Sequence, residues 1–329
     1  MPVPSRLRDT GLYIEGSSTV VRPAHLSFSP QYPLWTDGAN KRRWIHIPAG
    51  ASIDASDPDA WRFPAGTRIW KEFAFAGRRV ETRFMELGGD GAWRYATYLW
   101  LPDGSDALLA PLEGVPAGVP VGAARHAIPS QADCRACHEA SRSPVLGFAA
   151  LQLSSDRDPG ALHAAADPDD VDLAQLIERG IVRGLPAALV ERPPRIEAAT
   201  PAARAALGYL HGNCGGCHNA AGPLAPLGLV LAQSVADAGA SAVLASAVGR
   251  QSRFRAPGRP DAELRVAPGD AGASVVALRM RSRDPLLQMP PIGTLAVDEA
   301  AVALIERWIS QDLAAHGRAA NHQTKETRP

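Results

Sequence analysis

The sequence predicts a multidomain α+β fold, in which a β-rich antiparallel N-terminal domain is followed by two mainly α-helical modules. We expect the β-rich domain at residues 1–125, the modules at 126–199 and 200–317, and a flexible polar tail at 318–329. Three observations predict this order. Apolar and polar residues alternate with period 2 early in the chain, apolar residues recur at helical spacing later, and all four cysteines lie in the later part.

Composition excludes several classes of partner. The 329 residues include 34 basic and 34 acidic side chains, so the formal net charge is zero. A balanced charge gives no electrostatic basis for binding nucleic acid or an anionic membrane surface. No apolar run approaches the roughly 18–20 residues of a membrane-spanning helix, so no membrane span is expected. The 30 glycines and 29 prolines indicate a folded chain rich in loops.

The predicted β-rich domain contains one separate strand and a three-stranded meander. Residues 44–47 form an expected strand that ends at the turn sequence Pro-Ala-Gly. The runs 68–75, 78–87 and 93–101 are separated by short glycine-containing turns, which indicates antiparallel strands joined by hairpins. Residues 102–120 are rich in glycine and proline, and we expect them to form a connecting loop.

Helix signals follow in the two modules. Ser130 is placed to cap a helix that carries residues 133–138. Residues 171–182 have apolar side chains at helical spacing. Thr200, which proline follows, is a suitable cap for a helix at the start of the second module. Asp298 has the same role for a terminal amphipathic helix.

A C-x-x-C-H motif occurs twice and accounts for all four cysteines. This spacing is typical of c-type haem attachment, because the two thiols can form thioethers with the vinyl groups of one porphyrin. The adjacent histidine then becomes the proximal iron ligand. The sequence therefore predicts two covalently bound haem c groups, with His138 and His218 as axial ligands and the attaching residues Cys134, Cys137, Cys214 and Cys217.

Three other interpretations of the cysteines are a disulfide, a four-thiolate zinc site and a thioredoxin-like dithiol. Zinc ribbons usually separate their cysteine pairs by about 15–20 residues, whereas Cys137 and Cys214 are 77 positions apart. A redox dithiol does not require a histidine after its second cysteine, and here both motifs have one. Haem attachment accounts for more of the pattern than these alternatives.

The sixth iron ligands are expected among the methionines and histidines. Met289 is followed by two prolines, which force an extended loop that can present the sulfur to the haem on His218. A methionine can also be simple core filling. For the first haem, the candidates are His126, Met280 and His163, and an open sixth position is a further alternative.

Arginine is frequent in the predicted β-rich domain. Some of these side chains could pair with haem propionates or with an acidic partner protein. The alternative is that they lie on solvated strand faces beside Asp and Glu. The residues concerned are Arg42, Arg43, Arg62, Arg68, Arg78, Arg79, Arg83 and Arg94.

Two resemblances add to these patterns. The run GYLHGNCGGCHN, with GLVLA, APGD, SVVALRM, QMPPIGT and ALIERWI after it, is similar to class I cytochrome c domains of the bacterial multihaem type. This resemblance implies an all-helical second module with His/Met-ligated haem, in which Gly208 and Tyr209 pack against Trp308. The segments YPLWTDGANKRRW, WRFPAGTRIWKEF, RRVETRFM, IPSQADCRACH and VLGFAALQL resemble periplasmic dihaem c-type cytochromes.

The resemblance implies one-electron transfer between two haems and redox partner proteins, an electron donor and an electron acceptor. We also expect the second haem to have the higher reduction potential. The alternative is a peroxidase-like or small-molecule-oxidising enzyme with an open first haem, for which His126 or Glu139 could supply the acid or base. In that case the β-rich domain supplies a pocket or a docking surface.

A periplasmic location is expected, because the resemblance implies haem attachment outside the bacterial cytoplasm. The first residues, MPVPSRLRDTGLY, have no apolar segment typical of an export signal. We therefore expect that the signal has been removed or that the start has been assigned downstream of it.

Overall fold

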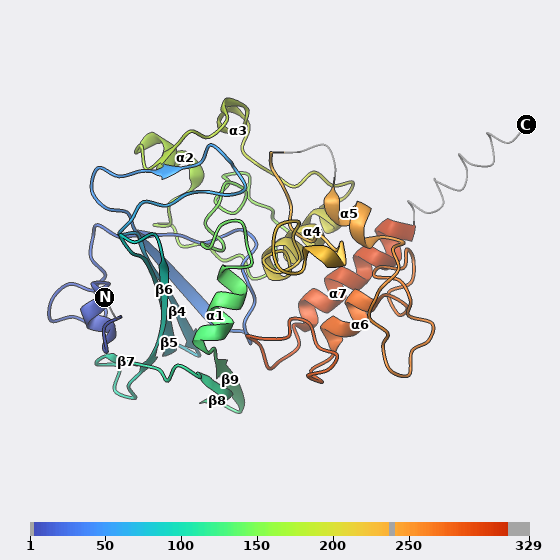
Figure 1. Ribbon diagram of the computed structural model, residues 1–329, viewed down its shortest axis with the longest axis horizontal. Helices are drawn as coiled ribbons and strands as arrows, with labels where there is room; N and C mark the ends of the chain where they lie inside the picture. The colour runs from blue at the N-terminus through green and yellow to red at the C-terminus, as the bar shows by residue number, and fades with distance from the viewer. Residues whose placement is uncertain (1–2, 237–240, 315–329) are drawn as a thin grey trace, which may run out of the picture.

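The computed structural model describes residues 3–236 and 241–314, and its largest element is a six-stranded antiparallel sheet (Figure 1). The strand order is β1-β2-β4-β5-β6-β7. The strands of this sheet are β1 (Leu26–Ser27), β2 (Asn40–His46), β4 (Arg68–Phe75), β5 (Arg78–Leu87), β6 (Trp93–Trp100) and β7 (Ala107–Leu109). Two smaller pairs are β3 (Ile53–Asp54) with β10 (Val182–Arg183), and β8 (Val115–Val121) with β9 (Ala124–Ile128).

The meander predicted from period-2 alternation is confirmed as β4, β5 and β6. The loop predicted at 102–120 is wrong, because β7 and most of β8 lie there. Strand β8 contains Pro116 and Pro120, which are tolerated because the β8–β9 hairpin stands outside the main sheet and has free edges.

The helices are short. They are α1 (Gln131–His138), α2 (Leu173–Glu178), α3 (Ala187–Glu191), α4 (Pro201–Asn213), α5 (Ala242–Ala247), α6 (Val275–Arg281) and α7 (Glu299–Arg307). There are also 3₁₀ turns at η1 (Leu7–Thr10) and η2 (Ala225–Leu227), and α7 continues into a π-helical turn, η3 (Trp308–Asp312). Figure 1 shows α1 in front of the sheet, with α4 to α7 grouped to the right of both.

The predicted fold class is wrong in its account of the later chain. Helix makes up about 22% of the structure and strand about 21%, so residues 126–199 and 200–317 are not mainly α-helical, cytochrome c-like haem modules. Their apolar residues are buried in turns as well as in helices: Phe148 and Leu153 are core residues outside any helix. Frequent glycine and proline interrupt helices without preventing this burial.

The predicted helix starts are confirmed. Side chains of Ser130, Thr200 and Asp298 each accept a hydrogen bond from the backbone N–H three residues later. The helix expected at 171–182 shortens to α2, because Gly180 adopts a positive φ of 66° and the chain then turns into β10.

The two faces of the sheet are covered differently. On one face, Trp44, Trp70 and Phe84 pack against the N-terminal segment around η1. The other face contributes to a larger core cluster that extends through the turns at 145–153 to α4, α6 and α7. The sheet and the later helices therefore share one continuous core.

The fold contains no candidate for a transmembrane helix within the described parts of the chain. The tail predicted at 318–329 lies outside the described residues.

Candidate functional site

The first C-x-x-C-H motif occupies α1, which packs beside β6. The Ser130 hydroxyl accepts from the Asp133 N–H at 3.1 Å, and the Asp133 carboxylate accepts from the Ser130 N–H at 2.9 Å. This reciprocal cap fixes the start of the helix. Residues three apart share a helix face, so Cys134 and Cys137 lie on one side. We call these cysteines and His138 the sheet-borne site.

The ring of His138 is oriented by the backbone. Its Nδ1–H donates to the Pro144 carbonyl oxygen at 2.6 Å, and its ring lies 5.3 Å from that of Tyr95. Burial lowers the pKa of His138 to about 4, the Pro144 acceptor opposes this shift, and Lys71 and Arg83 add to it. The imidazole is therefore neutral at pH 7 with Nε2 available, the arrangement typical of a metal-binding histidine.

The second motif follows α4. Cys214 is the C-cap of this helix, and its carbonyl accepts from the N–H groups of Cys217 at 3.2 Å and His218 at 2.8 Å. The side chain of Asn219 holds the next turn by accepting from the Gly222 N–H at 2.7 Å. We call Cys214, Cys217 and His218 the helix-borne site.

The His218 ring has no such orienting bond. Its buried Nδ1 has no hydrogen-bond partner within residues 3–236 and 241–314. Burial lowers the pKa of His218, with smaller contributions from Arg279 and Arg265. The neighbouring His211 is engaged elsewhere, since its Nδ1 accepts from the Gln233 N–H at 3.0 Å.

The two motifs converge, although about 80 residues separate them in the sequence. The thiols of Cys137 and Cys217 interact, which lowers the pKa of Cys217 to about 7 and raises that of Cys137. Asn219 Nδ2 donates to the Ala140 carbonyl at 3.0 Å. A Cβ on Gly222 would lie 2.3 Å from the same oxygen, so this close approach requires glycine. The second cysteine of each motif thus lies at the contact between the sites.

This convergence bears on the other interpretations of the cysteines. All four are free thiols. In the described part of the chain, no three His, Cys, Asp or Glu side chains are grouped so that they could hold one metal ion. A four-thiolate zinc site would therefore require the two motifs to rearrange.

The methionine candidates lie on the helical side. The Met289 N–H donates to the Arg279 carbonyl at 3.0 Å, which ties its loop to α6. The charge of Arg279 also acts on His218, so the Met289 loop is bonded to a residue that influences the helix-borne site. Met280 is 6% exposed and belongs to the core cluster with α4 and α7.

His126 is enclosed by carboxylates. It is fully buried on β9, with Nε2 2.8 Å from Glu81 Oε1 and Nδ1 3.3 Å from Asp37 Oδ2. Asp37 also accepts from Thr294 Oγ1 and from the N–H groups of residues 295 and 296. Both ring nitrogens of His126 are thus occupied, and the network joins the sheet to the segment after Met289.

Most of the frequent arginines are paired on the sheet surface. The pairs are Arg42 and Arg79 with Glu72, Arg62 with Asp54, Arg68 with Glu86, and Arg94 with Asp90, while Arg78 donates to the Pro120 carbonyl. Arg83 pairs with Glu81 at 2.7 Å and lies towards the interior. Arg43 is 8% exposed and has no ion-pair partner among residues 3–236 and 241–314. Pairing with a carboxylate or a carbonyl accounts for most of the set, although Glu72 is buried, and Arg43 and Arg83 differ from it.

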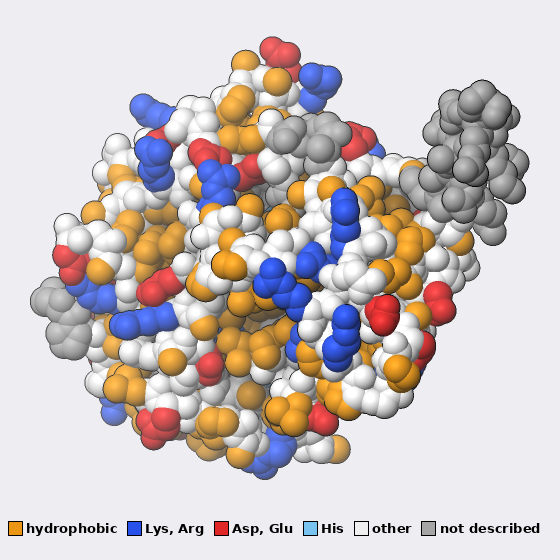
Figure 2. Space-filling view, turned by 45° about the vertical axis from the view of Figure 1, so that its right-hand side comes forward, with side chains coloured by type: hydrophobic (Ala, Val, Ile, Leu, Met, Phe, Trp, Pro, Cys, Tyr) orange, Lys and Arg blue, Asp and Glu red, His pale blue; other side chains and the backbone are white. Residues whose placement is uncertain are grey.

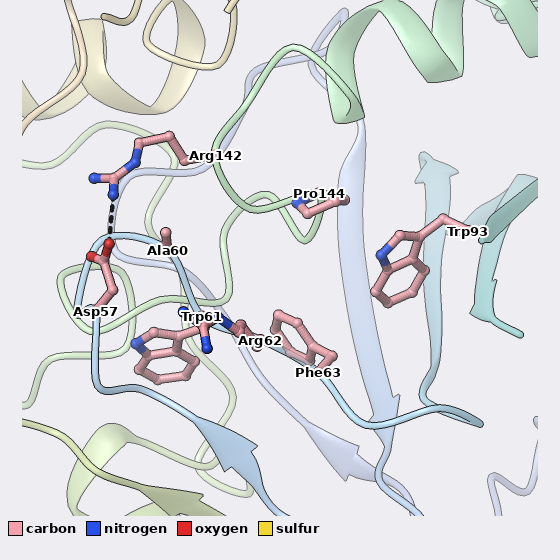
Figure 3. A pocket seen from close by; sticks show the side chains of 8 residues that line it. All are labelled: Asp57, Ala60, Trp61, Arg62, Phe63, Trp93, Arg142 and Pro144. Atoms are coloured by element: carbon pink, nitrogen blue, oxygen red, sulfur yellow. Dashed lines mark hydrogen bonds and ion pairs between the residues drawn. The ribbon is translucent and has the colours of Figure 1, made fainter. Parts of the chain in front are cut away.

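An open cavity of about 440 Å³ adjoins the sheet-borne site through Pro144 (Figure 3). The Arg142–Asp57 ion pair, at 2.5 Å, lies at one side of the cavity, and aromatic side chains line the other. The lining residues are Asp57, Ala60, Trp61, Arg62, Phe63, Trp93, Arg142 and Pro144. The cavity is thus lined by the residue whose carbonyl oxygen orients Nδ1 of His138, and His138 itself is not among the lining residues.

Three functional contacts were missed by the sequence analysis. Pro144 acts through its carbonyl oxygen, which no side-chain pattern reveals. Lys71 has no sequence signal of its own, because arginine is the frequent cation in this part of the chain. Asn219, directly after the second motif, was the one detectable signal, since asparagine commonly fixes turns with its side chain.

Comparisons of this chain with protein-family models, with curated proteins and with solved structures found no match.

Proposed function

We propose that this chain is a dihaem c-type cytochrome that transfers single electrons between partner proteins. The observation that carries the proposal is the convergence of the two C-x-x-C-H motifs, where Asn219 donates to the Ala140 carbonyl and the thiols of Cys137 and Cys217 interact. Two haems attached to these motifs would each have one thioether at the same contact. Electrons could then pass between the two sites within one molecule.

The residues present fit haem c. The thiols of both motifs are free, and both histidines are held neutral by burial. The bond from His138 to Pro144 leaves Nε2 available for iron. When bound, haem c supplies a reversible one-electron iron centre. The chain orients His138, buries both histidines and supplies the attaching sulfurs.

The proposal includes a sulfur ligand for the helix-borne iron. Met289 is supported by the attachment of its backbone to Arg279 in α6. A thioether ligand and an apolar surrounding raise the reduction potential, so we expect this haem to have the higher potential of the two. The electron donor and the electron acceptor are taken to be redox proteins of the periplasm, which follows from the family resemblance alone.

A second candidate function is a haem oxidoreductase with an open sixth position at the sheet-borne iron. It is favoured by the carboxylate bonds to both nitrogens of His126, which leave that ring unable to bind iron without a rearrangement. Peroxide or another small molecule would then reach the open position. The spin state of the oxidised protein discriminates between the two functions. Wholly low-spin haem excludes an open position, and a high-spin fraction that binds cyanide supports one.

The proposed function is tested by producing the full chain with a cytochrome c attachment system and measuring its covalent mass, haem content and zinc content. We expect two haems per chain and no stoichiometric zinc. A chain without covalent haem, but with one bound zinc or a Cys137–Cys217 disulfide, would overturn the proposal.

A further inference from the structure

Three cations lie side by side across the sheet, on the face that the sheet-borne site covers. Arg43 of β2 is directly opposite Lys71 of β4, and Lys71 is directly opposite Arg83 of β5. Directly paired residues of neighbouring strands project from the same face. We call Arg43, Lys71 and Arg83 the cation row.

The cation row is crowded around one aromatic ring. Lys71 Nζ lies 5.1 Å and Arg83 Cζ 4.3 Å from the centroid of the Phe73 ring, and Lys41 Nζ lies 5.8 Å from it. Like charges directly opposite each other in a sheet are destabilising. Cation–π attraction of about 0.5–2 kcal/mol per pair offsets part of this repulsion. Burial, and then the neighbouring cations, lower the pKa of Lys71 well below its ordinary value, so its positive charge is costly without an anionic partner.

One carboxylate pairs with the row. Glu81 is fully buried and accepts from Arg83, but the same oxygen also accepts from His126, and its second oxygen has no partner in the described structure. Within residues 3–236 and 241–314, neither Arg43 nor Lys71 has a side-chain hydrogen bond or ion pair; Asp170 acts on Arg43 only at longer range. Within the described residues, the row therefore has more basic side chains than acidic partners.

The cation row lies on the same sheet face as Tyr95, whose ring is 5.3 Å from that of His138 on α1. Electrostatic effects of Lys71 and Arg83 reach the ring of His138, and that of Arg83 reaches the thiols of Cys134 and Cys137. The neighbouring row of the same face is apolar, since Ile69 and Met85 pair across β4 and β5 and lie in the core. Figure 2 shows an apolar hollow near the centre of the visible face, with basic side chains along one side.

We propose that the cation row binds the propionate carboxylates of the haem attached at Cys134 and Cys137. A porphyrin carries two carboxylates on one edge and apolar rings elsewhere, which matches a cationic row next to an apolar row. Guanidinium and ammonium groups form strong charge-assisted hydrogen bonds with carboxylates. The inference rests on the proposed function, because it assumes a covalent haem at the sheet-borne site.

The test compares Lys71→Gln in two backgrounds, the haem-bearing chain and a Cys134→Ser/Cys137→Ser chain that cannot attach the first haem. Without the haem, removing one cation relieves repulsion, so Lys71→Gln should raise the midpoint of thermal unfolding. With the haem, the same change removes a carboxylate partner and should lower that midpoint. Arg43→Gln should behave in the same way, and both variants leave the Arg83–Glu81 pair intact.

The matched control is Arg68→Gln, on the same strand as Lys71 but on the opposite face, where Arg68 pairs with Glu86. In both backgrounds, Arg68→Gln should change the midpoint of thermal unfolding by no more than the small effect of a surface ion pair. An effect of Lys71→Gln that has the same sign in both backgrounds would overturn the inference.

Reduction potentials give a second readout that does not need the haem-free background to fold. Loss of a cation bound to the carboxylates should lower the potential of the sheet-borne haem and leave that of the helix-borne haem unchanged. Added inorganic phosphate should not affect the wild type. If phosphate raises its midpoint and Lys71→Gln abolishes that rise, the row binds a free anion and the inference is wrong.

Haem content separates this failure from failure of the proposed function. A chain that never carries covalent haem overturns both. A chain with two haems, in which Lys71→Gln and Arg43→Gln shift neither the potential nor the haem-bearing midpoint, overturns the assignment of the cation row alone.

Discussion

The sheet-borne and helix-borne sites have the same motif, but they differ in what holds the histidine ring. At the sheet-borne site, the Pro144 carbonyl fixes Nδ1 of His138, and a reciprocal cap fixes the helix below it. At the helix-borne site, the buried Nδ1 of His218 has no partner in the described residues. The chain thus fixes the first ring itself, whereas the second depends more on what its iron would supply.

The cations near the two sites also differ in their hydrogen-bond partners. Arg265 near His218 donates to the carbonyls of Leu227 and Gly228, and Arg279 stacks on Phe254 at 4.2 Å and donates to a carbonyl. These arginines hold loops together. In the described parts of the chain, no backbone carbonyl accepts from a side chain of the cation row, and of the three cations Arg83 alone is paired with a carboxylate there. Among the described residues, the sheet-borne site therefore has an anchored histidine and a cation row with few partners. The helix-borne site has a histidine without a described anchor, and its arginines are bonded to backbone carbonyls.

The largest expected effect comes from removing one pair of attaching cysteines at a time. Each of Cys134→Ser/Cys137→Ser and Cys214→Ser/Cys217→Ser should lose one of two haems. The second change should also lower the midpoint of thermal unfolding further, because the helix-borne ring lacks its own anchor. Haem absorbance per chain and thermal unfolding measure both effects. A larger loss of stability in the sheet-borne variant would reverse the comparison.

Met289→Ala should affect the helix-borne site alone. Loss of the thioether should convert that haem to high spin or bring in a weaker ligand, and should lower its reduction potential. Met280→Ala is the control: truncation of this buried side chain should cost about 2–5 kcal/mol of stability without a change of ligand. Low-temperature EPR spectra of both variants decide the matter. A changed sheet-borne signal in Met280→Ala would instead make Met280 the ligand of the first haem.

The sequence predicted local structure better than it predicted architecture. Caps at Ser130, Thr200 and Asp298 depend on residues three positions apart, so a local pattern is sufficient. The helical modules were overpredicted, because burial in turns such as 145–153 depends on a sheet surface that is distant in the sequence. A helical period does not reveal whether a partner surface replaces the helix.

The cation row could not be predicted from the sequence for a different reason, because it depends on the register of β4 and β5. The two-residue turn after Phe75 would place Lys71 opposite Thr82 if the hairpin were regular. A bulge between Phe73 and Ala74 shifts the register by one residue, which brings Arg83 opposite Lys71. Because a one-residue shift moves every side chain to the other face, the row could not be predicted without the bulge.

His126→Gln should lower the free energy of unfolding by about 3–5 kcal/mol, since it disrupts a buried charge network with Glu81 and Asp37. Burial alone would lower the pKa of His126, but its bonds to these carboxylates raise it by more, and the net shift is upward. The stabilisation is complete below the unfolded pKa of about 6.5 and is lost as pH rises through the folded pKa.

Wild-type stability should therefore decline from neutral to mildly alkaline pH, and the variant should lack this decline. Denaturant unfolding at a series of pH values measures it. His163→Gln, which removes a partly exposed histidine beside Asp298, should keep the wild-type pH dependence. If His126→Gln kept it as well, the network would not contain a protonated histidine.

The smallest expected effect tests how the helix-borne site is attached to the rest of the molecule. The resemblance implied that Gly208 allows close approach of Trp308, but the three atoms nearest to a Cβ on Gly208 all belong to the ring of Tyr32, the closest at 2.0 Å. Tyr32 is 3% exposed and donates to Asp158, so it cannot move away easily. Gly208 of α4 therefore packs against Tyr32, a side chain from the β-rich part of the chain.

Gly208→Ala should destabilise the fold by about 1–3 kcal/mol through overpacking, although alanine favours helix. Gly216→Ala, inside the second motif, is the matched control, because its Cβ would meet only Leu146 methyl groups at 3.8 Å. Denaturant unfolding should separate the two variants. Because Tyr32 fixes α4, Gly208→Ala should also shift the helix-borne potential and leave the sheet-borne one in place. Equal shifts of the two reduction potentials would mean that the two sites move as one rigid unit. The contrast between them would then be limited to the direct bonds of His138 and His218.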